Sequence, residues 1–117
     1  MPDDINLAEL AGRLIRDPEL RFTPKGTQVC NVGIATNRQV GARELSEFHN
    51  LVAWAELATR LGALSKGDRV HVKGRIQSRS WEGQDGAKRR TVEVVVEEIL
   101  PAEARAMASS VRLDEPF

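Results

Sequence analysis

Basic side chains fall on alternate positions of the segment 69–81, a spacing that can bind anions. Because successive side chains of a β-strand point to opposite faces, one face of a strand here carries Arg69, His71, Lys73, Arg75, Gln77, Arg79 and Trp81. The other face carries Val70, Val72, Gly74, Ile76 and Ser78. Lys and Arg pair with phosphates, and an aromatic ring stacks on an unpaired base. The basic face is therefore predicted to lie outside the core and to suit a single-stranded nucleic acid.

A second segment, 47–55, divides its side chains in a similar way. Phe48, Asn50, Val52 and Trp54 share one face, and His49, Leu51 and Ala53 share the other. If Phe48 and Trp54 face the same way as Arg75, Arg79 and Trp81, the fold has a basic groove with several aromatic rings. The sequence also allows the alternative that Phe48 and Trp54 are ordinary core residues.

Other chemistry finds little support in the residue pattern. His49 and His71 have no metal-like spacing to each other or to Cys30, and no nucleophile has a His and an acid arranged around it. No glycine-rich phosphate loop is present in the sequence. We therefore expect no catalytic residue, no metal and no cofactor. Cys30 is interpreted as a small core residue, and His49 as a hydrogen-bonded core or subunit-contact residue.

Charge is unevenly distributed along a chain whose formal net charge is zero. The 117 residues contain 17 Lys and Arg against 17 Asp and Glu, yet residues 60–90 hold 9 basic and 3 acidic side chains. Such a block indicates either a local anion-binding surface or simply a solvated face. No apolar run reaches the roughly 20 residues of a membrane helix, and the start lacks a signal-peptide pattern. We expect a cytoplasmic protein with no membrane contact.

The elements that must position these residues are mostly strands. Alternating and β-branched runs predict strands at 5–15, 27–36, 47–55, 69–81 and 90–100, with loops at 17–26, 37–46 and 82–87. Leucines at helical spacing predict one short helix at 56–64. The order β-β-β-α-β-β is that of an all-β OB-fold, a five-stranded Greek-key barrel. We expect this domain to cover residues 1–100, followed by a short flexible tail over 101–117.

At this point the motifs resemble those of a known family, over about residues 5–100. The chain resembles the bacterial single-stranded DNA-binding proteins through the series Gly12-Arg13-Leu14, Asp17-Pro18-Glu19, Ala35-Thr36-Asn37-Arg38, Phe48-His49, Arg79-Ser80-Trp81 and Thr91-Val92-Glu93-Val94-Val95. The resemblance implies an OB-fold subunit of a homotetramer, encoded by a bacterium, phage or plasmid. It also implies non-catalytic, largely sequence-independent binding of single-stranded DNA during replication, recombination and repair.

The resemblance assigns roles to individual residues of this chain. Base stacking is assigned to Phe48, Trp54 and Trp81, and contact with the phosphate backbone to Arg38, Lys73, Arg75, Arg79, Lys88 and Arg89. The last residues match an acidic tip that docks onto replication and repair enzymes, namely Asp114, Glu115, Pro116 and Phe117. Two departures stand out: Val40 lies where the family often has a further aromatic, and no long linker precedes the tip.

One alternative function remains open at the level of sequence. The short chain and its meagre tail also suit a dimeric OB-fold accessory protein of a replication-restart complex, which would act mainly through protein partners. Oligomeric state discriminates the two, because a tetramer favours wrapping of DNA and a dimer favours the accessory role.

Overall fold

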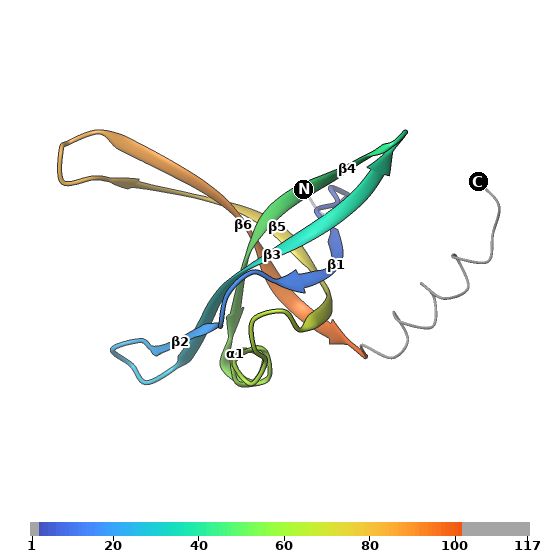
Figure 1. The fold of residues 1–117 in the computed structure, drawn as a ribbon. Coiled ribbons are helices and arrows are strands. Elements are labelled where there is room, and N and C mark those ends of the chain that lie inside the picture. Colours follow the sequence, from blue (N-terminus) through green and yellow to red (C-terminus); the bar gives the residue numbers. More distant parts are fainter. Residues whose placement is uncertain (1–2, 102–117) are drawn as a thin grey trace.

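Strands form most of residues 3–101, the part of the chain that the computed structural model describes. In chain order they are β1 (Ala8–Leu14), β2 (Glu19–Phe22), β3 (Gln28–Val40), β4 (Arg43–Trp54), β5 (Arg69–Glu82) and β6 (Lys88–Leu100). A single helix in this range, α1 (Ala55–Gly62), connects β4 to β5 (Figure 1). No helix among these residues is long and apolar enough to cross a membrane.

The strands form one sheet that closes on itself. The sheet order is β1-β5-β6-β4-β3-β2, and an additional antiparallel pairing between β1 and β3 closes a barrel of β1, β3, β4, β6 and β5. β4 and β6 pair in parallel, with Leu51 beside Val94 and Val52 beside Val95. The other pairings are antiparallel. The prediction of an all-β OB-fold barrel with one short helix is therefore confirmed.

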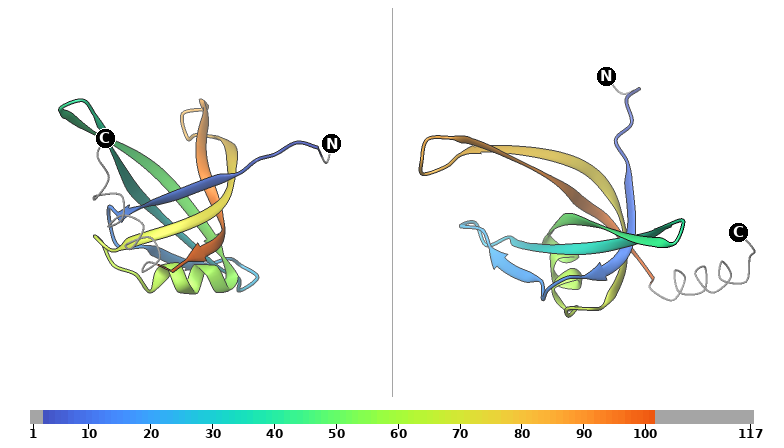
Figure 2. Two further views of the ribbon diagram at one scale, coloured as in Figure 1. Left: turned by 90° about the vertical axis from the view of Figure 1, so that its right-hand side faces the viewer. Right: turned by 45° about the horizontal axis from the view of Figure 1, so that its top comes forward.

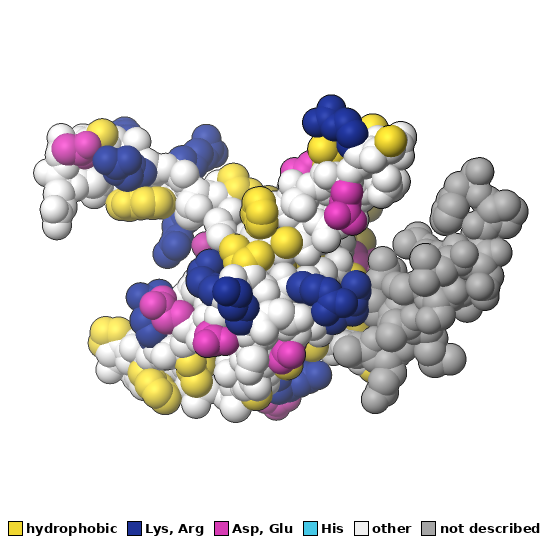
Figure 3. Space-filling model, in the orientation of Figure 1, with side chains coloured by type: hydrophobic (Ala, Val, Ile, Leu, Met, Phe, Trp, Pro, Cys, Tyr) yellow, Lys and Arg dark blue, Asp and Glu magenta, His cyan; other side chains and the backbone are white. Residues whose placement is uncertain are grey.

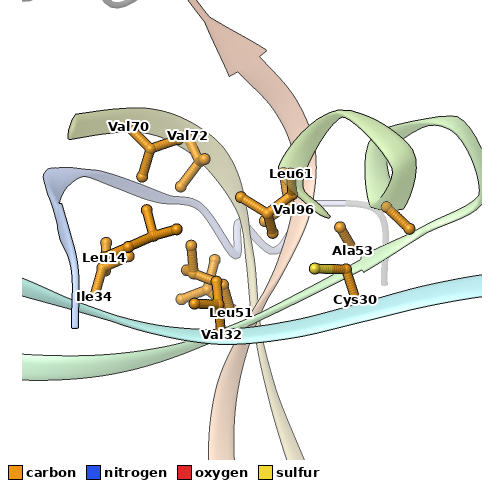
Figure 4. Packing of buried hydrophobic residues seen from close by; sticks show 12 residues of the cluster. Leu14, Cys30, Val32, Ile34, Leu51, Ala53, Leu61, Val70, Val72 and Val96 are labelled. Carbon is orange, nitrogen blue, oxygen red and sulfur yellow. The ribbon is translucent and has the colours of Figure 1, made fainter. Parts of the chain in front are cut away.

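The core lies inside the barrel and consists mainly of small aliphatic side chains (Figure 4). Alternate residues of the predicted strands supply it, among them Val70 and Val72 of β5, which are 3% and 0% exposed. Leu61 of α1 is fully buried, so the helix covers one end of the barrel. Cys30 is also fully buried, which confirms its prediction as a core residue. Burial raises the pKa of the Cys30 thiol because it disfavours the thiolate.

Two pairs of strands continue beyond the barrel as two-stranded ribbons. The ends of β3 and β4 form one, and the ends of β5 and β6 form the other, called here the β5–β6 arm (Figures 1 and 2). Ile76 and Val92, on the inner parity of the arm, are 48% and 56% exposed because no other strand covers them. Gly41 and Gly86 lie in the two turns with φ of +61° and +81°, which glycine adopts without strain.

Two predicted loops were wrong in part. Residues 37–46 contain the end of β3 and the start of β4, which pair along their length from Asn37 with Ser46 to Val40 with Arg43. Residues 17–26 contain β2, whose side chains are exposed and which pairs only with β3. Both stretches lie outside the barrel. In β2, Leu20 and Phe22 alternate with charged residues, but the strand is only four residues long and lies between Pro18 and Pro24. Residues 37–46 show no hydrophobic alternation, because that ribbon buries no apolar face.

A bulge in β6 sets the direction of the β5–β6 arm. Lys73 pairs with Glu98 and Gly74 with Val96, which leaves Glu97 as an extra residue in β6. A Cβ atom on Gly74 would lie 1.9 Å from the backbone oxygen of Val95, so only glycine permits the close approach of the two strands here. β-Bulges bend a strand and increase its twist, and this bulge lies where the arm leaves the barrel.

The connection from β4 to α1 carries backbone strain next to an aromatic residue. Ala55 has φ of +55°, in the left-handed region that non-glycine residues avoid, whereas Trp54 before it is extended at φ −120° and ψ 151°. This turn allows the chain to pass directly from the strand into the helix. Trp54 is thereby fixed at the last position of β4.

Substitution of glycine at this strained residue is expected to stabilise the fold. Relief of the left-handed conformation is worth about 1–2 kcal/mol, and the greater freedom of glycine in the unfolded chain offsets about 0.4–1 kcal/mol of it. Ala55→Gly should therefore raise the free energy of unfolding by about 0.5 kcal/mol in urea denaturation. The matched control is Ala63→Gly at the end of α1, where φ is −80° and glycine relieves nothing. Ala63→Gly should lower stability, and a loss in both variants would contradict strain at Ala55.

Candidate nucleic-acid interface

The outer face of β4 carries exposed aromatic side chains. Leu51 and Ala53 point into the barrel and are 1% and 0% exposed, whereas Phe48 and Trp54 on the opposite parity are 68% and 46% exposed. The division of side chains predicted for this strand is therefore confirmed. The alternative that Phe48 and Trp54 belong to the core is wrong.

The register of the sheet places Trp81 on the same outer face. Val52, which shares its parity with Phe48 and Trp54, lies beside Val95 across the β4–β6 pairing, and Val95 lies opposite Arg75. Every second residue from Arg75 along β5 then shares this face, which reaches Trp81 opposite Arg89 near the end of the arm. Trp81 is 47% exposed. We call this surface of β3, β4, β6 and β5 the aromatic face.

Several predicted phosphate contacts lie on the aromatic face, and each arginine there has an acidic neighbour. Arg75 Nε lies 3.3 Å from Glu97 Oε2, Arg79 Nη2 lies 3.5 Å from Glu93 Oε1, and Arg89 Nη2 lies 3.0 Å from Asp85 Oδ2. These guanidinium groups are about half exposed or more, so the cations stay accessible. The pairs of Arg75 and Arg89 are weak because their carboxylates are exposed as well, whereas Glu93 beside Arg79 is buried. Lys88 pairs with Glu82, on the parity opposite to that of Trp81, but it lines a surface hollow together with Trp81 at the end of the arm.

Figure 3 shows Lys and Arg side chains along the β5–β6 arm and on the neighbouring surface of the barrel, with exposed hydrophobic side chains between them.

Two other predicted contacts lie apart from this arrangement. Arg38 pairs with Leu45 on the β3–β4 ribbon, on the parity opposite to that of Phe48. Lys73 shares the parity of Arg75 but lies between Glu9 of β1 and Glu98 of β6 in the sheet. Arg38 therefore points away from the aromatic face of its own ribbon, and Lys73 has two acidic cross-strand neighbours.

Sequence reasoning placed Asn50 on the face of Phe48 and Trp54, but it did not place Arg16, Asn31 or Glu93 there. Arg16, Asn31, Asn50 and Glu93 line a hollow of about 120 Å³ together with Arg79 and Thr91. Arg16 reaches it because the chain after β1 crosses Gly33, where a Cβ atom would lie 3.1 Å from Arg16 Nη1. The sequence contained one signal that could have located this hollow, namely the carboxylate of Glu93 within a run of valines from Val92 to Val96.

The two histidines have protein partners. Thr36 Oγ1 and His49 Nε2 are hydrogen-bonded at 2.9 Å, which agrees with the interpretation of His49 as a hydrogen-bonded residue. His71 Nε2 lies 2.6 Å from Glu9 Oε2 on β1. Among residues 3–101 no group of three or more His, Cys, Asp or Glu could hold a metal ion. The predicted tip, Asp114 to Phe117, lies outside the described residues, and its docking onto replication and repair enzymes stays a prediction.

Comparison with known proteins gives a consistent result. The family model described as "Single-strand binding protein family" matches residues 5–101. A "Single-stranded DNA-binding protein" of Oceanobacillus iheyensis is similar, with 46% identity over 100 residues that cover 81% of this chain and 62% of that protein. One from Neisseria meningitidis is 43% identical over 101 residues, covering 81% and 58%. One from Thermus thermophilus is 44% identical over 86 residues, covering 73% and 33%. The chain thus matches less than two thirds of the length of each of these relatives.

Exposure of Trp81 predicts a small effect of its removal on stability. Trp81→Ala removes a half-exposed ring on the arm, so the free energy of unfolding should change by about 0.5 kcal/mol or less. Leu61→Ala is the matched core control and should cost about 2–5 kcal/mol, because Leu61 is fully buried. Urea denaturation followed by far-UV circular dichroism measures both. A Trp81→Ala variant as unstable as Leu61→Ala would place the ring in a packed core.

Proposed function

The chain belongs to the single-strand binding protein family, and from this premise we propose that it binds single-stranded DNA. Binding is non-catalytic and largely independent of base sequence, and it protects single strands during replication, recombination and repair. The observation that carries the proposal is the placement of three exposed rings, Phe48, Trp54 and Trp81, on one face of the sheet with Arg75, Arg79 and Arg89.

The aromatic residues supply contacts that a duplex cannot use. An unpaired base exposes its flat π-face, and stacking on an aromatic ring contributes about 1–3 kcal/mol per base. All four bases have such a face, so the contact discriminates little among sequences. In a duplex the same faces are covered by neighbouring bases, and the rings have nothing to stack against.

The arginines supply attraction to the phosphates. Arg75 and Arg89 are held by single carboxylates in exposed ion pairs, which contribute about 0–1 kcal/mol each. At these two residues a phosphate can replace the carboxylate at little cost, and the release of counterions from the strand favours the exchange. Arg79 is itself exposed and can contact a phosphate while it stays beside the buried Glu93. Lys88 beside Trp81 and Arg16 at the polar hollow extend the same basic track.

Titration of the protein with an unstructured oligo-dT and with a duplex of equal length tests the proposal. Tryptophan fluorescence comes only from Trp54 and Trp81, so stacking of bases on either ring should quench it strongly with the single strand. The duplex should quench little at the same concentration. Equal responses to both nucleic acids, or no response to either, would contradict binding through the aromatic face.

Salt provides the control for the phosphate contribution in the same titration. The observed association constant should fall with added salt, with a logarithmic slope of about −0.7 for each phosphate that the protein neutralises. Binding that does not respond to salt would leave the arginines without a role.

Self-association into a homotetramer is the second part of the proposal. β1 pairs fully with β5, but only Arg13 and Leu14 pair with β3, so residues 8–12 have an edge that no other described strand covers. Ile5 and Leu7 beside it are 88% and 68% exposed. An uncovered edge with exposed apolar side chains is a surface on which another subunit can pair.

The mass of the DNA-free protein in sedimentation equilibrium tests this part. A tetramer of the 12.9 kDa chain supports it. A stable dimer would instead support the alternative function, that of an accessory protein in a replication-restart complex. The names of the relatives do not favour this alternative.

A further inference from the structure

A buried carboxylate lies in the middle of the aromatic face. Glu93 is 6% exposed, although its neighbours on this face of the arm, Arg79 and Arg89, are largely in solvent. Acidic side chains are seldom buried unless they are paired, and a surface that attracts phosphates gains nothing from a negative charge. Resting on the proposed function, we propose that Glu93 is a specificity-determining residue that reads the amino groups of bases, N4 of cytosine and N6 of adenine.

The carboxylate has acceptor capacity left after its protein contacts. Gln77 Nε2 donates a hydrogen bond to Glu93 Oε2 at 2.9 Å, and Arg79 Nη2 lies 3.5 Å from Glu93 Oε1. An ionised carboxylate offers about four acceptor positions. Gln77 and Arg79 use two of them, one through a long contact. Each oxygen therefore retains a lone pair for a further donor.

The surroundings give a base access to these lone pairs. Glu93 borders the polar hollow of about 120 Å³ lined by Arg16, Asn31 and Asn50. It also borders a second hollow of about 230 Å³, whose lining includes Phe48 and Asn50. The predicted stacking ring and the carboxylate thus line one depression, so a base stacked at Phe48 has its edge near Glu93.

The chemistry of the base edges decides which bases this acceptor favours. Cytosine and adenine present amino groups, which donate hydrogen bonds, and Glu or Asp accepting from cytosine N4 is a recurring contact of base recognition. Thymine has only the N3–H donor, which lies between two carbonyl oxygens that repel a carboxylate. Glu93 should therefore add affinity for cytosine and adenine relative to thymine within a largely unselective site.

The test measures the Kd of oligo-dC and of oligo-dT of equal length for the wild type and for Glu93→Gln. The pH is mildly alkaline, so that cytosine is neutral. The amide keeps the shape of the side chain, but it has one acceptor oxygen and an NH₂ group that can donate a hydrogen bond to thymine O4. The ratio Kd(dC)/Kd(dT) should rise by about fivefold or more, the lower end of what one specific base contact provides. Glu97→Gln is the matched control. Glu97 lies on β6 like Glu93 and also pairs with an arginine, Arg75, but its side chain is exposed. Its ratio should equal that of the wild type.

The ratio separates base reading from a purely structural role. If Glu93 only positions Arg79, Glu93→Gln changes both affinities by the same factor and the ratio stays constant, which overturns this proposal and leaves the proposed function intact. If the wild type binds neither oligonucleotide, both proposals fail. Should Glu93→Gln not fold, Glu93→Asp withdraws the carboxylate by one methylene, and the ratio should rise in the same direction. An unchanged ratio in the folded Glu93→Asp protein then overturns the proposal.

Discussion

The register between β4 and β6 is the constraint on which the aromatic face depends. In this parallel pairing Leu51 lies beside Val94, and both side chains are buried in the barrel. A strand has a side-chain period of two, so a slip of one residue would turn Leu51 outward and bring Trp54 toward the core. Burial of the aliphatic residues on one side therefore fixes which rings are exposed on the other. The packing of the core and the chemistry of the surface are set by the same pairing.

Sequence reasoning succeeded where a strand covers the core and failed where it does not. Val70 and Val72, or Leu51 and Ala53, alternate with polar residues because one face is buried, so these strands could be predicted with their faces. β2 and the β3–β4 ribbon lie outside the barrel, where pairing requires only backbone hydrogen bonds. The alternation in β2 is only four residues long and lies between two prolines, and the ribbon shows no alternation. Composition and alternation report burial; they do not report pairing between exposed strands.

The same distinction applies to the candidate site. Trp81 and Arg79 were predictable because they continue the alternation that buried Val70 and Val72 establish earlier in the same strand. Arg16 was not, because it reaches the polar hollow only after β1 pairs with β3 and the following residues cross Gly33. That contact joins positions far apart in the sequence, and alternation within one strand carries no information about it. Arg38 illustrates the converse, since a motif match placed it at the interface while its strand parity points it to the opposite face of the ribbon.

In the proposed role, a carboxylate among arginines meets two different demands on the binding of single strands. Attraction to phosphates acts over about a Debye length, roughly 8–10 Å in physiological salt, and is insensitive to base identity. Hydrogen bonding acts only at contact and depends on orientation. Glu93 is 6% exposed and has the Arg79 guanidinium beside it, so its repulsion of the backbone is largely offset. Its remaining lone pairs still act on any donor that enters the hollow. In the proposed role, affinity comes from the exposed rings and cations, and discrimination between bases comes from one buried acceptor whose charge Arg79 largely offsets.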